Sequence, residues 1–189
     1  LVSDLRDIER YESGQMRLEM GSVAFAQVCR ESLIPLQQQF EDRQQQVVLE
    51  VRDDLPFIWG DHKRLIQVMT NFLTNGNKYT PPGGKVTVKV DESVNLWDTE
   101  GARRVLHIQI IDTGIGISEE DQKRLFREKY FRTDNAKATD QPGTGLGMVL
   151  TRGLILQHGG QVWVESELNV GTTFHFTLPL ADEVMREAT

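Results

Sequence analysis

The sequence predicts an α/β two-layer sandwich, in which a mixed and mostly antiparallel sheet is covered on one face by helices. Three observations lead to this fold. Segments with helical spacing alternate with segments of strand-like alternation, as in sheets that pack against helices. Two pairs of strands follow each other without a helix between them, so each pair forms an antiparallel hairpin and a purely parallel sheet is excluded. Residues 62–78 carry a broad apolar face, which suits a helix lying on a sheet.

Helices and strands alternate in the first half of the chain. The spacing of apolar residues predicts helices over 1–13, 22–43 and 62–78, and strands over 16–20 and 47–51. Pro35 is expected to kink the second helix. Asp61 is a suitable N-cap for the third helix, which the Pro-Pro-Gly-Gly segment 81–84 ends.

The second half contributes most of the sheet. We expect strands over 85–91, 104–111, 161–166 and 172–179, and a helix over 146–158 that Gly159-Gly160 closes. Residues 92–103 form the polar loop of a hairpin. Ser118 with Asp121 three residues later marks the start of a further helix, as in a capping box. Residues 127–144 are polar and lack a clear period, so they are expected to form a mobile loop.

Composition and charge restrict the classes of partner. With 28 acidic and 21 basic residues the net charge is −7, and no long Lys/Arg run occurs, so nucleic acid and anionic membrane surfaces are poor candidates. No apolar stretch approaches the roughly 20 residues of a membrane span. Cys29 is the single cysteine and cannot form an internal disulfide, which fits a reducing compartment. The chain begins at Leu1 without Met, as expected for a fragment of a longer protein.

A helix face with two carboxamides and one ammonium group is the first candidate site. Asn71, Asn75 and Lys78 are spaced i, i+4 and i+7, so they share one side of the helix over 62–78. A solvated polar face is the ordinary interpretation of any one of them. Two asparagines in register are less common, because Asn is a mediocre helix former. Carboxamide oxygens suit a Mg²⁺ that also binds phosphate and water, and an ammonium group can balance a triphosphate.

A second candidate site begins at Asp112, which follows an apolar strand and precedes Thr-Gly114-Ile-Gly116. An Asx-type turn that leaves a sheet explains this pattern without a ligand. As a binding residue, a buried carboxylate would accept a hydrogen bond from the exocyclic amine of a base and reject a base that lacks this donor. The two glycines would then let the base and sugar approach the backbone.

A second glycine cluster, Gly143-Thr144-Gly145-Leu146-Gly147, opens a predicted helix. Backbone N–H groups at a helix N-terminus attract phosphate, although a flexible hinge has the same pattern. The cluster is not a P-loop, because no Gly-Lys-Ser/Thr follows, and not a Rossmann fingerprint, because a polar loop precedes it. At the start of that loop, Phe126, Tyr130 and Phe131 could anchor a lid, and Arg132 could reach a γ-phosphate.

In this order, the motifs resemble those of the ATP-binding catalytic domain of sensor histidine kinases, within the gyrase-like ATPase superfamily. The resemblance covers nearly the whole chain. It is carried by an N box over 71–80, an adenine-contacting box over 112–117, a phenylalanine box over 126–132, a glycine box over 143–147 and a Gly-Thr motif over 171–174. It implies the end of a dimerisation helix and its hinge over 1–15, an ATP-binding domain of the Bergerat type over 16–182 and a C-terminal tail over 183–189.

The resemblance also implies roles for individual residues. Asn75 would be the principal Mg²⁺ ligand and Asn71 would assist, so that both act in catalysis together with Arg132, which would help the γ-phosphate. Asp112 would bind the adenine amine, helped through water by Thr172. The nucleotide, ATP or ADP, would further contact Lys78, Tyr79, Gly114, Gly116, Ile117, Tyr130, Gly143, Thr144, Gly145, Leu146 and Gly147.

Three departures from the family pattern stand out. Gly76-Asn77 replaces Ala and an aliphatic residue, a change that would loosen this helix turn. The phenylalanine box holds one extra residue, so Tyr130 and Phe131 fill the aromatic slots by a shift. The phosphoacceptor, a His followed by an acidic residue, is absent. No catalytic or metal-binding role is assigned to the four histidines, His62, His107, His158 and His175.

The first hypothesis is therefore a histidine kinase domain that binds Mg-ATP and delivers the γ-phosphate to a histidine on a dimerisation domain outside this fragment. Its expected partners are ATP, that dimerisation domain and a response regulator receiver domain, with no nucleic acid and no direct membrane contact. The resemblance implies a cytoplasmic domain and leaves membrane anchoring of the parent protein open. A gyrase-like ATP-hydrolysing domain is weaker, because such enzymes place a Glu general base where Asn71 stands. A degenerate nucleotide-binding module is the third alternative.

Overall fold

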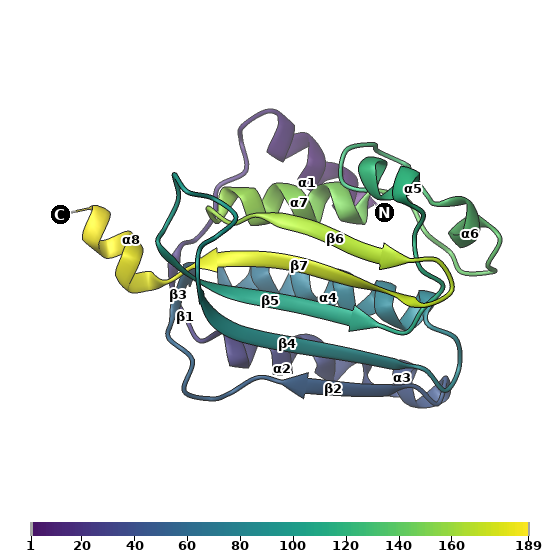
Figure 1. The fold of residues 1–189 in the computed structure, drawn as a ribbon. Coiled ribbons are helices and arrows are strands. Elements are labelled where there is room, and N and C mark those ends of the chain that lie inside the picture. Colours follow the sequence, from purple (N-terminus) through teal and green to yellow (C-terminus); the bar gives the residue numbers. More distant parts are fainter. Residues whose placement is uncertain (1, 189) are drawn as a thin grey trace.

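A five-stranded mixed sheet forms one layer of the protein (Figure 1). In this computed structural model, which describes residues 2–188, the strand order is β2-β4-β5-β7-β6. β2 is parallel to β4, and the other neighbours are antiparallel. The strands are β2 (Gln46–Glu50), β4 (Lys85–Val94), β5 (Arg104–Asp112), β6 (Val162–Glu167) and β7 (Gly171–Pro179).

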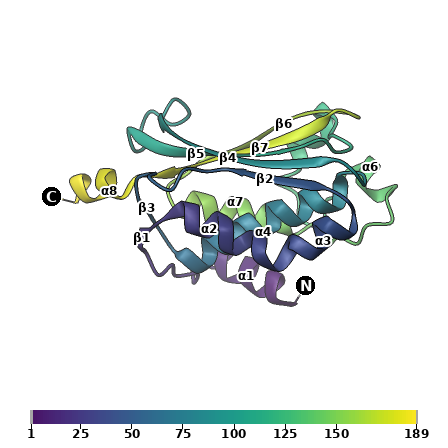
Figure 2. The ribbon, with the colours of Figure 1, turned by 90° about the horizontal axis from the view of Figure 1, so that it is seen from below.

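Helices cover one face of this sheet (Figure 2), so the predicted two-layer sandwich is confirmed. The longest is α4 (His62–Tyr79), and α7 (Gly147–Gln157) and α2 (Phe25–Leu33) lie beside it. α1 (Val2–Glu12) packs on the outer side of α7. No helix in the described part of the chain combines the length and hydrophobicity needed to cross a bilayer.

Aromatic side chains join the helical layer to the sheet. The ring of Phe72 on α4 stacks on Phe176 with centroids 5.6 Å apart and also contacts Phe174 at 5.2 Å. On β5, alternate residues Leu106 and Ile108 are fully buried against the helices. This alternation is the expected signature of a sheet with one covered face.

The N-terminal region departs from the prediction. The prediction of a strand over 16–20 is wrong. The structure has no strand at these described residues, and the N–H of Glu19 donates to the carboxylate of Asp61 (2.8 Å) instead of to a neighbouring strand. The strand here is β1 (Gly21–Val23), which pairs with β3 (Ile58–Gly60), a strand that the sequence did not indicate. Both strands have three residues, too few for a recognisable alternation.

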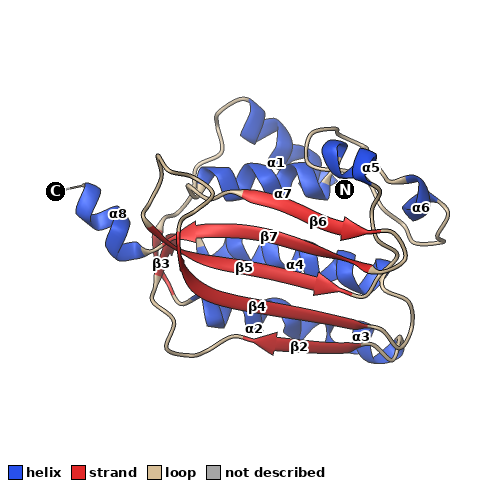
Figure 3. Ribbon diagram, viewed as in Figure 1, coloured by secondary structure: helices blue, strands red, loops and turns tan. Residues whose placement is uncertain are grey.

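Three further segments differ in detail. The helix predicted over 22–43 is interrupted at Pro35, giving α2, the 3₁₀ turn η1 (Ile34–Leu36) and α3 (Gln37–Asp42). The loop over 127–144 follows α5 (Glu119–Arg124) and contains one helical turn, α6 (Asp134–Lys137). Near the C-terminus, α8 (Ala181–Glu187) extends away from the sheet (Figure 3).

Gly76-Asn77 does not interrupt α4, contrary to the expected loosening. A Cβ at Gly76 would lie 3.2 Å from both methyl groups of Val86, so glycine lets α4 approach β4 closely. The buried side chain of Asn77 donates to Gln45 Oε1 (2.8 Å) and to the carbonyl of Gln39 (3.2 Å). Both residues therefore fix the end of α4 against its neighbours.

Removal of the N-cap of α4 is expected to lower the stability of the protein measurably. Asp61 is buried, and its carboxylate accepts from the N–H groups of Arg64 (3.1 Å) and Glu19 (2.8 Å). Asp61→Ala removes both acceptors, so we expect the free energy of unfolding to fall by about 1–3 kcal/mol. Asp53→Ala is the control, because this carboxylate is 84% exposed and Arg30 is its one ion-pair partner among residues 2–188. Equal losses in the two variants, measured by urea denaturation, would contradict the capping role.

Candidate nucleotide-binding site

One cavity of about 320 Å³ collects most of the predicted site residues. It lies between α4, the carboxyl end of β5, the segment 131–146 and the start of α7. The predicted residues that line it are Asn71, Asn75, Lys78, Tyr79, Asp112, Gly116, Ile117, Arg132, Gly143, Thr144, Gly145, Gly147 and Thr172.

Three predicted residues lie outside this lining. Leu146 is fully buried in the hydrophobic core, so it anchors the start of α7. Tyr130 is 62% exposed and has a positive φ of 59°. Gly114 instead supports the site, because its N–H donates to Asp112 Oδ1 (2.8 Å).

The lining of the cavity also contains residues that were not among the predicted nucleotide contacts. Most are apolar, which suits the faces of a planar base: Ile115, Leu125, Phe131, Ala136, Pro142, Met148 and Phe174, together with Thr133 and Asp4. Ile115 could have been found from its place between the two selected glycines. Phe174 is the last residue of the Gly-Thr motif over 171–174. Asp4 carries no local signal, because α1 reaches the cavity only through the tertiary fold.

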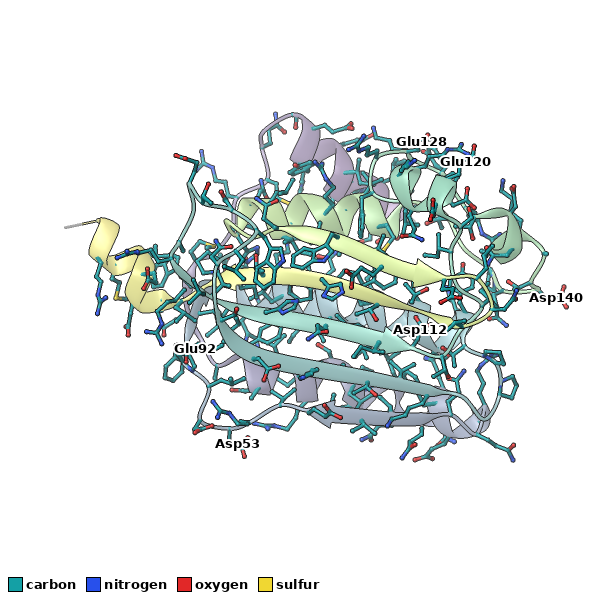
Figure 4. The ribbon with its side chains drawn as sticks, viewed as in Figure 1. Asp53, Glu92, Asp112, Glu120, Glu128 and Asp140 are labelled. Carbon is teal, nitrogen blue, oxygen red and sulfur yellow. The ribbon has the colours of Figure 1, made fainter. Side chains whose placement is uncertain are left out.

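Asp112 lies at the carboxyl end of β5 (Figure 4), directly opposite Thr172 of β7. Its Oδ1 accepts from the N–H groups of Gly114 (2.8 Å) and Thr172 (3.3 Å). No described residue donates to its Oδ2. Burial raises the pKa of this carboxyl to about 6, although the two N–H groups lower it. The geometry leaves one carboxylate oxygen to accept a hydrogen bond from a ligand.

Two cations also line the cavity. Lys78 Nζ donates to the carbonyl of Pro142 (3.0 Å), and the Arg132 guanidinium donates to the carbonyls of Ala136 (3.0 Å) and Gln141 (2.8 Å). Among the described residues neither cation forms an ion pair, and the buried Nε of Arg132 has no partner. Burial, and then the charge of Arg132, lower the pKa of Lys78. An anionic group in the cavity would satisfy both cations.

Glycine is required at two positions where the segment 131–146 and the start of α7 approach neighbouring residues closely. Gly145 has a φ of +71°, and a Cβ there would lie 2.4 Å from the backbone of Tyr130. A Cβ at Gly147 would lie 2.6 Å from Asn71 Oδ1, so this glycine lets α7 start against the carboxamide face of α4. Larger side chains would displace the lid or separate α4 from α7.

Metal binding at this site would depend on carboxamide oxygens. Asn71 Nδ2 donates to Thr151 Oγ1 (2.5 Å), which orients the carboxamide, and Asn75 lines the cavity one turn later. Residues 2–188 hold no group of three or more His, Cys, Asp or Glu side chains that could ligate a metal. The residues present therefore fit a Mg²⁺ that is bound largely by phosphate and water, and not a cation held by protein alone.

All four histidines are engaged away from the cavity. His158 accepts from the N–H of Asp61 (3.0 Å), and His62 pairs with Glu31 (2.8 Å). On the sheet face away from the helices, His107 bonds to His175 (3.0 Å). His175 bonds in turn to Glu165 (2.8 Å) and stacks on Trp163, which also packs against Trp97. None of the four lines the nucleotide cavity.

Burial of Asp112 predicts a pH-dependent cost in stability. Its pKa is about 6 in the folded protein against 3.8 for the free group, so the folded state binds more protons between these values. Stability therefore falls as pH rises through this window and levels off above it. Asp112→Asn removes the charge and retains an acceptor oxygen. We expect it to raise the free energy of unfolding at pH 7.5 by about 1–3 kcal/mol, with the gain lost near pH 4.

Urea denaturation of both proteins across this pH range measures the effect. Asp91→Asn on β4 is the matched control, because the Asp91 side chain is 57% exposed. A gain of the same size at both ends of the range, or the same profile in the control, would contradict the cost assigned to burial of Asp112.

Comparison with known proteins agrees with this geometry. The family described as histidine kinase-, DNA gyrase B-, and HSP90-like ATPase matches residues 60–182. Drug sensory protein A from Synechocystis sp. is 36% identical over 187 residues, which are 98% of this chain and 28% of that protein. Adaptive-response sensory kinase SasA from Gloeothece citriformis is 33% identical over 180 residues, which are 95% of this chain and 43% of that protein.

A solved structure extends the comparison to three dimensions. Full-length ShkA in complex with AMPPNP aligns with a TM-score of 0.78 and 26% identity, over 95% of this chain and 35% of that one. The chain spans less than half the length of the two curated relatives described above. The match over 60–182 covers α4, every strand of the main sheet except β2, and the segment 127–144. The chain belongs to the histidine kinase-, DNA gyrase B- and HSP90-like ATPase family, and its fold is that of a histidine kinase catalytic domain.

Proposed function

We propose that this chain is the ATP-binding kinase domain of a sensor histidine kinase. It holds Mg-ATP and delivers the γ-phosphate to a histidine on the helical dimerisation domain of its parent protein. The observation that carries the proposal is that one cavity is lined by a buried carboxylate and by two cations that form no ion pair with a described residue. A nucleotide has the complementary groups, an amino group on its base and a negatively charged triphosphate.

Asp112 would recognise the adenine. Its Oδ1 is occupied by backbone N–H groups, so Oδ2 is the oxygen that would accept the exocyclic amine. A base without this donor would leave a buried carboxylate without its partner. Ile115, Ile117 and Phe174 would cover the base from water.

Lys78 and Arg132 would position the triphosphate. Both are already anchored to carbonyls of the described chain, so they would lose little conformational freedom when the nucleotide binds. The unpartnered Nε of Arg132 is a donor that a phosphate oxygen would satisfy. The backbone at Gly143 and Gly145 would approach the same phosphates beneath the lid.

Asn75 and Asn71 would hold Mg²⁺ through their carboxamide oxygens. When bound, Mg²⁺ supplies charge neutralisation on the β- and γ-phosphates. The hydrogen bond from Asn71 to Thr151 would fix the orientation of one ligand before the ion arrives.

The side chain at position 71 favours transfer of the phosphoryl group to a histidine over hydrolysis. A gyrase-like enzyme needs a general base there to activate water, and a carboxamide cannot accept that proton. Phosphoryl transfer instead needs positioning and charge stabilisation, which this cavity offers. The phosphorylated histidine would then serve a response regulator receiver domain. A degenerate module is disfavoured because the carboxylate, the cations and the glycines all converge on one cavity.

Base recognition by Asp112 gives the first test. We expect ATP to bind about 10- to 100-fold more tightly than ITP, which lacks the exocyclic amine. Asp112→Ala should weaken ATP binding by a similar factor and abolish the preference. Calorimetric titration in the presence of Mg²⁺ measures both. Asp140→Ala is the matched control, since this lid carboxylate lies outside the cavity (Figure 4). Full ATP affinity in Asp112→Ala would refute the assignment.

Phosphoryl transfer gives the second test. Radioactive γ-labelled ATP should leave this chain unlabelled, and should label a histidine-bearing dimerisation domain added in trans from a related sensory kinase. Asn75→Ala should abolish that labelling because it removes the principal Mg²⁺ ligand. Thr74→Ala is the control, because Thr74 is the adjacent residue of α4 and does not line the cavity. Stable label on the chain itself, or rapid release of free phosphate, would favour a different enzyme.

A further inference from the structure

The edge of the sheet at β6 has backbone groups that remain available for pairing. β6 is an outer strand with β7 as its only neighbour in the five-stranded sheet. The carbonyl of Gln161 accepts from the N–H of Thr177 (2.9 Å), so the backbone at this residue points toward β7. Because the direction alternates along a strand, Val162 and Val164 direct their N–H and C=O groups away from β7.

A hydrogen bond at the carboxyl end of β6 agrees with this alternation of backbone direction. Ser166 alternates with Val162 and Val164, and its carbonyl accepts from Gln122 Nε2 of α5 (3.0 Å), on the side away from β7. A side chain therefore caps the edge at one end. No described residue outside β7 bonds to the backbone of Val162 or Val164.

A hollow of about 490 Å³ runs along this edge, between β6, α5 and α7. In Figure 1 these three elements surround the upper edge of the sheet. Three cations line the hollow, Lys123, Arg127 and Arg152, against one acid, Glu119. All three cations are exposed, and none forms an ion pair with a described residue. This is a basic groove on a chain whose net charge is −7.

We propose that the groove docks an extended acidic segment of a partner protein, which adds to β6 as a further strand. The free N–H and C=O groups of Val162 and Val164 would bond to its main chain, as in strand addition at other sheet edges. Lys123, Arg127 and Arg152 would select carboxylates on the segment. The hollow shares no lining residue with the nucleotide cavity, so this docking does not depend on the proposed kinase function.

Binding of a defined peptide tests the proposal. The probe is a fluorescein-labelled peptide of alternating Glu and Val, compared with the same peptide in which Lys replaces Glu. We expect the acidic peptide to bind at least about tenfold more tightly, and the difference to shrink as salt increases. Hydrogen exchange should slow at the amides of Val162 and Val164 when it binds. Trp163 and Glu165 are the internal reference, because their amides already face β7.

A charge-reversed variant distinguishes binding in the groove from a general attraction of the acidic peptide to positive charge. The double substitution Arg127→Glu and Arg152→Glu should weaken binding of the acidic peptide by at least about tenfold. The double substitution Arg17→Glu and Arg52→Glu makes an equal charge change outside the groove and should leave binding unchanged. The peptide comparison on the unmodified chain stands even where a variant fails to fold. Three results would overturn the proposal: no binding at millimolar peptide, equal binding of the Lys peptide, or equally strong competition by a single-stranded oligonucleotide.

Discussion

The contact between α4 and the sheet determines where the site residues of α4 lie in the cavity. Phe72 stacks on Phe176, and Gly76 lies against Val86 without an intervening side chain. These contacts bury the apolar face of α4, and another side of the helix carries Asn71, Asn75 and Lys78 into the cavity. A change that lifts α4 from the sheet would separate the carboxamides from Asp112 without touching either. Packing and ligand recognition therefore depend on the same helix.

Asp112 illustrates how a site can lower the stability of its own fold. The carboxylate is buried at the end of a strand, and burial alone would favour its neutral form. Two backbone N–H groups offset part of this cost, and the remaining oxygen stays available. A residue chosen only for stability would be neutral here. A ligand that donates a hydrogen bond to the second oxygen would explain why a carboxylate stands at position 112.

Local signals made much of the fold and site predictable. Asp61 precedes the apolar face of α4 and caps it, and the glycine clusters lie beside the cavity as their spacing indicated. Features that depend on distant contacts were not predictable. β1 and β3 are too short to show alternation, and Asp4 reaches the cavity through α1. The family resemblance assigned Leu146 to the phosphates, and its apolar side chain is buried in the core.

The lone Nε of Arg132 has a consequence for the free protein. A buried donor without an acceptor among the described residues lowers the stability of the folded chain, and so does a buried carboxylate with one unused oxygen. A nucleotide that satisfies both would stabilise the folded chain by mass action, in proportion to the logarithm of its free concentration. Resistance of this domain to heat and proteases would then report on the supply of nucleotide in its surroundings.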